Sequence, residues 1–326
     1  MLRAEAFARM RMNTRSLVRI AGLVASAAAV VWIGHRFAQS GALGLIGRAP
    51  VARSSLAFAV AGAAAAYALA LSMLALAWWR LTSALSATPA PPRPIMATWA
   101  ATQYGKYLPG NVAHYALRHA WSRRYGLTHA GLGLASIIEA ALLLIAALGL
   151  TLLADTRRLR GLAMLDPRIA IALLVAMIVG LGIALHFARS RAFLERWHVP
   201  ALPPTATLVF CLACCVAFFV VAAGLLDGLA RVLGFEVDSF AMLLAASAAS
   251  WAAGFVVIGA PGGLGVREAA FVALAGGALG DDKALLLIGL FRIVTFLGDT
   301  LLFAAGALLL RKAAGVGDSQ THRSAP

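Results

Sequence analysis

Two short segments combine glycine, proline and charged side chains within a chain that is otherwise strongly apolar. In the first, residues 101–126 (ATQYGKYLPGNVAHYALRHAWSRRYG), Lys106 lies close to Pro109 and two glycines. Proline lacks an N–H and glycine permits turns, so we expect a half-helix, a kink and a second, basic amphipathic helix. Broken backbone at membrane depth lines a wet cavity or is buried in protein, which makes Lys106 a candidate anion ligand. The alternative is a loop lysine that extends to the membrane interface beside two tyrosines.

The second segment, residues 259–270 (GAPGGLGVREAA), has Pro261 and four glycines between two apolar stretches. It places Arg267 and Glu268 at the start of a predicted helix, where backbone N–H groups are free and a guanidinium adds two parallel donors. This pattern predicts a phosphate site, whereas the alternative is a plain connecting turn followed by an exposed pair of charges. Interrupted segments in both halves of a transporter-like chain indicate a substrate site, so we expect the two segments to act together.

Three more ionisable residues, Glu139, Arg292 and Asp299, fall within apolar runs, where a charge without a partner is costly. Arg292 and Asp299 are seven residues apart on one helix face, which separates them by about 10 Å along the axis. Each is therefore expected to meet a group on another helix. The alternative to a binding site is a charge network that only joins helices, and such a network is compatible with a site beside it. The candidate partners are Glu139, Lys106, Arg267 and Glu268.

The composition of the whole chain sets the class of protein that must position these groups. Of its 326 residues, 62% are hydrophobic and 13% are charged, and the mean hydropathy is +0.86. A soluble domain carries about 25% charged residues, so a soluble globular protein is excluded. We predict an all-α integral membrane protein with about eight transmembrane helices and additional broken or re-entrant helical segments. Residues 1–326 form one membrane domain in this prediction, with a bundle over residues 17–310.

The expected spans follow the apolar stretches of about 20 residues. The first resembles a signal peptide, and we interpret it as an uncleaved helix; cleavage near Ala38 is the alternative. The remaining small-residue runs, such as GAAAAYALA and LLAASAASWAAG, are interpreted as packing surfaces. The eight stretches are residues 17–35, 56–79, 129–153, 169–187, 205–226, 241–259, 266–280 and 284–310.

Charge predicts the orientation of the chain. The net charge is +15, and basic residues concentrate in the arm at residues 1–16, the loop near residues 189–196 and the tail at residues 311–326. Basic segments of polytopic proteins stay in the cytoplasm, so both termini are expected there, although the three arginines at residues 157–160 disagree. In a membrane chain this charge indicates contact with anionic lipid headgroups, and no nucleic-acid partner is expected.

No metal or cofactor site is predicted. The three cysteines, Cys211, Cys214 and Cys215, lie in one apolar run without a nearby His or acid, so we interpret them as packing residues and expect no zinc site. No cofactor motif is visible in the sequence.

Four features follow one another along the chain: GKYLPG, a basic segment with Arg118, PGGLGVRE, and an Arg and an Asp two turns apart in the last helix. Together they resemble the lysylphosphatidylglycerol synthase transmembrane-region family, which includes the flippase part of the multiple peptide resistance factor. The resemblance covers nearly the whole chain. It departs from the family's best-known members because no aminoacyl-transferase domain follows residue 310, so lysyl transfer is not expected.

This resemblance implies a helical bundle that binds a phospholipid-like or polyprenyl-linked lipid in an internal cavity and moves it between the leaflets of the bacterial inner membrane. A membrane scaffold for a glycosyltransferase or a lipid-modifying enzyme is the alternative. A polytopic glycosyltransferase is less favoured, because residues 36–55 contain no acid, and we do not expect an enzyme. The expected substrate-binding residues are Lys106, Tyr107, Pro109, Gly110, Arg118, Pro261, Gly262, Gly263, Arg267 and Arg292, and the expected charge network is Glu139, Glu268 and Asp299.

Overall fold

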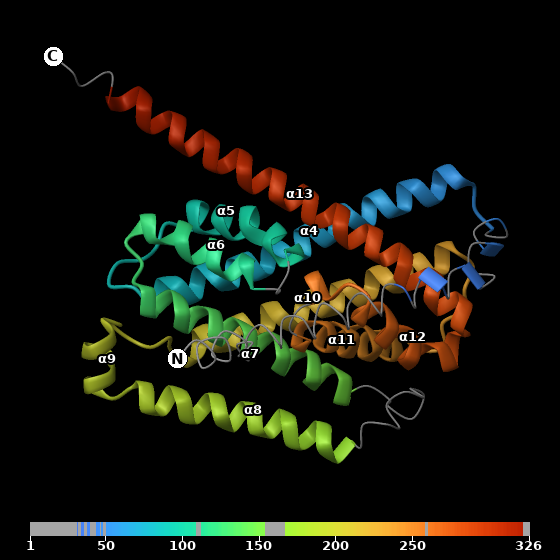
Figure 1. The fold of residues 1–326 in the computed structure, drawn as a ribbon, viewed down its shortest axis with the longest axis horizontal. Coiled ribbons are helices and arrows are strands. Elements are labelled where there is room, and N and C mark those ends of the chain that lie inside the picture. Colours follow the sequence, from blue (N-terminus) through green and yellow to red (C-terminus); the bar gives the residue numbers. More distant parts are fainter. Residues whose placement is uncertain are drawn as a thin grey trace, which may run out of the picture.

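The protein is an all-α membrane protein, as predicted (Figure 1). A computed structural model describes residues 50–108, 112–153, 167–257 and 260–321, with scattered positions between 31 and 47, and all regular elements in these ranges are helices. The first predicted span, the arm at residues 1–16 and the arginines at 157–160 therefore lie wholly or largely outside the described residues. The helices are α4 (Arg53–Ala84), α5 (Pro92–Thr102), η1 (Gln103–Tyr107), α6 (Ala113–Ser122), η2 (Arg123–Tyr125), α7 (His129–Leu153), α8 (Pro167–Ala188), α9 (Arg191–Trp197), α10 (Thr205–Val232), α11 (Phe240–Val256), η5 (Pro261–Gly263), α12 (Val266–Leu279) and α13 (Asp281–Thr321).

Within these ranges, six helical stretches are long and apolar enough to cross a membrane. Five of them lie in α4, α7, α8, α10 and α13, close to predicted spans, and the sixth joins η5 to α12. The expectation of a full span at residues 241–259 is wrong, because α11 has 17 residues and ends at Val256. At 1.5 Å per residue it covers about 26 Å, less than the roughly 30 Å of a hydrocarbon core.

The short helices form two hairpins. The predicted break in residues 101–126 is confirmed, because α5 ends in the 3₁₀ turn η1 and the chain returns through α6. We call α5, η1 and α6 the first hairpin. The second hairpin comprises α11, η5 and α12, with its turn at Pro261–Gly263. Its last helix is joined to α13 by Gly280 alone, which has a φ of 87°.

The two hairpins enter the bundle from opposite ends (Figure 1). Loops flanking the first hairpin share a surface cavity with α9 that includes Ser86, Tyr125 and His198; we call this the α9 end. Loops flanking the second hairpin lie at the other end, where Gly234 contacts Pro50 and Lys283 lies over Phe235. The two broken segments therefore open at opposite ends, because α11 and α12 turn back inside the bundle.

The tips of the hairpins meet between the two ends. A Cβ atom on Gly262 would lie 2.9 Å from the ring of Tyr107, so only glycine permits this approach of η5 to η1. Gly262 also has a φ of 58°, which an L side chain disfavours. The expectation that the two interrupted segments act together is thus met by their contact.

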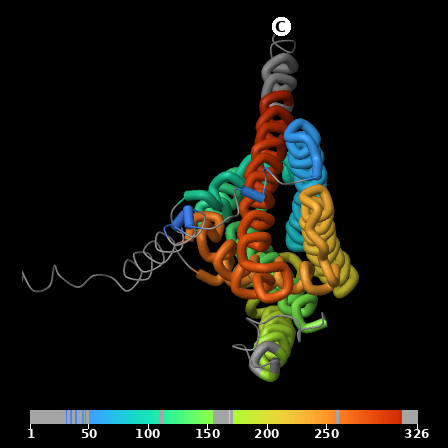
Figure 2. The backbone as a smooth tube through the Cα atoms, turned by 90° about the vertical axis from the view of Figure 1, so that its right-hand side faces the viewer, coloured from blue at the N-terminus to red at the C-terminus, as the bar shows by residue number. Residues whose placement is uncertain are grey.

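The surrounding bundle packs these tips closely. Helix α13 runs diagonally across α4 and α5, and α10 packs against α4 and α7. The three cysteines of α10 are buried in this packing, as predicted, and Cys211 donates to the carbonyl of Ala77 at 3.5 Å. Helix α8 lies apart at the edge of the bundle (Figure 2), and its exposed apolar side chains suit contact with lipid.

Close packing of α13 on α5 should make Gly306 intolerant of a side chain. An added Cβ would lie 2.7 Å from the backbone nitrogen of Ala101 and 2.8 Å from the carbonyl of Ala97. We expect Gly306→Ala to lower the melting temperature, since such overpacking costs about 1–3 kcal/mol. Gly224→Ala on α10 is the control, because nothing lies within 4 Å of its Cβ position. Thermal unfolding of both purified variants in the same detergent checks this, and equal melting temperatures would contradict the packing.

Candidate binding site at the hairpin tips

The first hairpin is tied to α13 through Asp299. The Lys106 ammonium in η1 lies 2.8 Å from one carboxylate oxygen of Asp299, and the Tyr107 hydroxyl donates to the other at 2.5 Å. Asp299 is fully buried. Next to it, the hydroxyls of Tyr104 and Thr300 are hydrogen-bonded. Burial of Asp299 is therefore compensated by two groups from one hairpin tip.

The second hairpin is tied to the same helix through Arg292. The Arg292 guanidinium pairs with Glu268 at 3.3 Å and donates to the carbonyl of Gly262 at 3.1 Å. Both α13 charges thus find partners on other helices, and both partners were among those predicted. Since Arg292 and Asp299 are two turns apart, each hairpin is fixed at its own level of α13.

We predicted an anion site on free amides of the glycine turn, but three of those amides already donate hydrogen bonds within the protein. Glu268 accepts a hydrogen bond from the Gly265 amide at 2.7 Å, so the protein's own carboxylate occupies the start of α12. The amides of Gly263 and Leu264 donate to carbonyls within the turn. These three amides are therefore not available to an anion.

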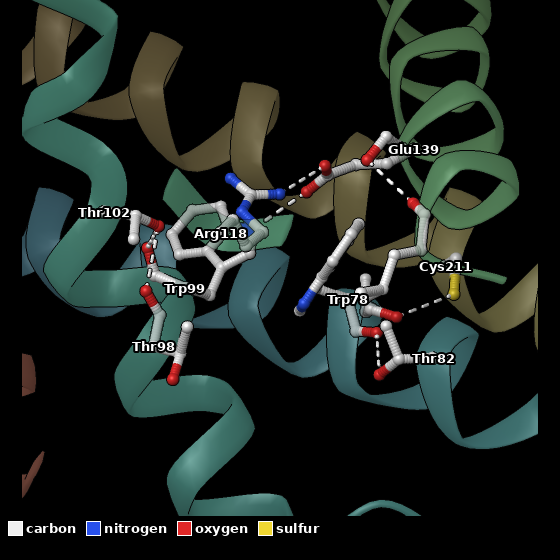
Figure 3. Close-up of polar contacts among 11 residues, drawn as sticks. Trp78, Thr82, Thr98, Trp99, Thr102, Arg118, Glu139 and Cys211 are labelled. Carbon is white, nitrogen blue, oxygen red and sulfur yellow. Dashed lines mark hydrogen bonds and ion pairs between the residues drawn. The ribbon is translucent and has the colours of Figure 1, made fainter. Parts of the chain in front are cut away.

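Arg118 and Glu139 form a separate buried pair at 2.6 Å (Figure 3). Glu139 also accepts from the Trp99 indole at 2.9 Å, and the Arg118 guanidinium lies over the rings of Trp78 and Trp99. Arg118 is 1% exposed. The resemblance placed Arg118 among the substrate-binding residues, but this geometry places it in the charge network that joins α6 to α7.

Arg267 differs from these cations because it forms no ion pair within the part of the chain that the structure describes. Its Nε atom is buried without a hydrogen-bond partner, and its guanidinium lies over Trp251. Gly254 and Gly263 contact its side chain, because a Cβ on either glycine would collide with it. Arg267 is thus confined in position while its charge is available.

Two internal cavities flank Arg267, with volumes of about 50 and 60 Å³. The first also reaches Glu268 and Arg292, and the second reaches Lys106 and the Arg118–Glu139 pair. The wall between them contains residues that line both cavities. Each has room for a few water molecules, so a lipid headgroup requires the hairpins to separate. The shared residues are Tyr67, Phe218, Trp251 and Arg267.

Part of this wall was not predicted from the sequence. Tyr67 and Trp251 lie in the two small-residue runs that were interpreted as packing surfaces only. The sequence feature that could have identified these two residues is the single large aromatic side chain within each run of small side chains. Of the predicted site residues, Pro109 and Gly110 lie outside the described residues. The structure brings the other substrate-site and network residues to the hairpin tips or the cavity walls beside them.

Comparison with known proteins adds no family: no family model matches the chain, and no curated protein matches it significantly. The resemblance based on the two motifs therefore stays a prediction.

Removal of Arg118 should destabilise the protein, because it leaves the Glu139 carboxylate buried without its counter-charge. We expect Arg118→Met to cost about 3–5 kcal/mol. The double variant Arg118→Met/Glu139→Gln should recover most of this loss, since a neutral amide can still accept from Trp99. Arg231→Met removes an ion pair whose arginine is 73% exposed, so the melting temperature should not change. Thermal unfolding of the four proteins checks the pair, and a double variant no more stable than Arg118→Met would contradict it.

Proposed function

We propose that this protein is a lipid translocase, which binds an anionic phospholipid, a modified lipid or a polyprenyl-linked glycolipid and moves it between leaflets. The observation that carries the proposal is a basic cluster where two hairpins from opposite ends meet, in which Arg267 forms no ion pair with any described residue. Discontinuous helices that meet near mid-membrane are typical of transporter substrate sites. The same contacts are compatible with the family resemblance.

In the proposed mechanism, the headgroup phosphate binds Arg267 while the acyl chains stay in the lipid. Arg292 is the second donor in this mechanism, because it lines a cavity with Arg267 and its pairing with Glu268 is longer than the other two buried pairs. An anion that competes with Glu268 for Arg292 weakens the attachment of the second hairpin to α13. Opening of the first hairpin requires Lys106 and Tyr107 to leave Asp299.

Paired charges lower the cost of moving a headgroup through this site. An isolated charge in a low-dielectric interior is unfavourable by several kcal/mol or more, whereas a phosphate paired with a guanidinium at hydrogen-bond distance is largely compensated. The aromatic wall between the cavities separates the two entrances until a headgroup arrives.

We place the α9 end in the cytoplasm of a bacterial inner membrane. Arg123, Arg124, Arg189, Arg191 and Arg196 lie at or near this end. Among the described residues around the loops of the second hairpin, at the opposite end, Glu236, Asp238, Asp281 and Asp282 outnumber Lys283. This distribution follows the preference of basic loops for the cytoplasm. With this orientation, the first hairpin opens toward the cytoplasm and the second toward the other side.

Lipid movement in proteoliposomes tests the proposal. We expect Arg267→Gln to reduce the movement of a fluorescent anionic phospholipid at least about tenfold, since it removes a charged donor worth about 1.5–3 kcal/mol. The variant breaks no ion pair among the described residues, so the protein should still fold. Arg231→Gln, on the surface, is the matched control and should leave the rate unchanged.

Two other results would argue against a translocase. If Arg267→Gln fails to accumulate, the cluster is a structural network. If wild-type protein moves no lipid but co-purifies with a glycosyltransferase or a lipid-modifying enzyme that needs it for activity, the chain is a scaffold.

A further inference from the structure

The buried charges around the hairpin tips do not cancel. Among the described residues, the cations of this region are Lys106, Arg118, Arg267 and Arg292, and the carboxylates are Glu139, Glu268 and Asp299. Each of the three carboxylates pairs with one of these cations, and Arg267 is the cation that remains without an ion pair. His114 lines one cavity, and burial together with the neighbouring Arg118 lowers its pKa, which favours the neutral imidazole.

A surplus of one positive charge has a direct consequence for the ligand. In an apolar surrounding, the bound state is favoured when the ligand brings the opposite charge in the same amount. A neutral or cationic headgroup leaves Arg267 uncompensated, and a dianion adds a negative charge that no free cation meets.

The geometry around Arg267 suits a phosphate group, and the charge count selects the diester among phosphates. Gly254 and Gly263 lie against its Cγ, Cδ and Nε atoms, and its guanidinium lies over the Trp251 ring, so the side chain is confined on both sides. The Nε atom without a partner belongs to this fork, and a planar fork matches two oxygens of one phosphate.

We propose, building on the proposed function, that Arg267 selects lipid phosphodiesters carrying one net negative charge. Phospholipids such as phosphatidylglycerol and polyprenyl-phosphate sugars share this chemistry. The site discriminates against zwitterionic lipids, against lipids made cationic by an added amino acid, and against phosphate monoesters.

Native mass spectrometry of the full-length protein in zwitterionic nanodiscs measures this selectivity. The probes are phosphatidylglycerol, a polyprenyl-phosphate sugar, phosphatidylcholine, lysyl-phosphatidylglycerol and phosphatidic acid. We expect both monoanionic diesters to bind at least about tenfold more tightly than the other three, with Arg267→Gln removing this preference and Arg231→Gln retaining it. Competition between the two diesters identifies the preferred source.

Glu268→Gln is a variant that should bind a more highly charged phosphate better than the wild-type protein does. It removes the carboxylate that neutralises Arg292 but keeps an oxygen for the Gly265 amide, so the helix cap is retained. The surplus becomes two positive charges, and the preference should shift toward phosphatidic acid, whose monoester carries about −1.5 to −2.

A second perturbation leaves every charge in place. Gly254→Ala puts a methyl group where the Arg267 side chain lies, so it should weaken phosphatidylglycerol binding severalfold. Gly228→Ala, with nothing within 4 Å of its Cβ position, should not.

The selectivity is overturned if wild-type protein binds phosphatidic acid or lysyl-phosphatidylglycerol as tightly as phosphatidylglycerol, or if Arg267→Gln leaves all five affinities unchanged. Failure of the proposed function has a different signature: selective binding lost in Arg267→Gln, but no lipid movement in proteoliposomes. Lipid movement that depends on Arg267 equally for all headgroups would retain the translocase and remove the charge selection.

Discussion

The arrangement of this protein depends on the cost of leaving a charge unpaired inside a membrane-embedded bundle. Within its apolar part, helix α13 carries Arg292 and Asp299 two turns apart, and neither can satisfy the other. Each instead holds the tip of a different hairpin: Asp299 holds the first through Lys106, and Arg292 holds the second through Glu268. The two segments of broken backbone are therefore fixed to a common helix by electrostatics as well as by packing.

Small residues make this pairing possible. Ion pairs form only if the tips approach each other and α13 closely, and Gly262 provides the space for Tyr107. Gly298 on α13 lies close to the backbone of Ala64 and the ring of Tyr67, and Gly306 lies against α5. Glycine weakens a helix in isolation, but here it brings backbones together and shortens the distances between charges.

The sequence was sufficient to predict the fold class, the break near Lys106 and the fact that Arg292 and Asp299 each pair with a group on another helix. Those predictions follow from local chemistry, because composition, proline and the spacing of charges act on the chain directly. How far residues 241–259 extend across the membrane could not be predicted in the same way. An apolar run of this length can form either a full membrane span or one arm of a hairpin. Whether Arg267 has an ion-pair partner depends on which acidic residues the other helices place beside it, and tertiary packing decides this. The same is true of the cavity walls at Tyr67 and Trp251.

The single-residue connection at Gly280 makes the two hairpins mechanically unequal. The second hairpin is covalently continuous with α13, so displacement of α12 at its Gly280 end carries the start of α13 with it. The first hairpin is separated from its neighbours by the loop at residues 85–91 on one side and by η2 and residues 126–128 on the other, and it can hinge alone. An entrance at the α9 end can thus open by a local motion, whereas an entrance at the opposite end engages the longest helix of the bundle. In the proposed translocase, two entrances with such unequal attachments would have different opening barriers, and the rates of lipid passage in the two directions would then differ when the lipid is out of equilibrium between leaflets.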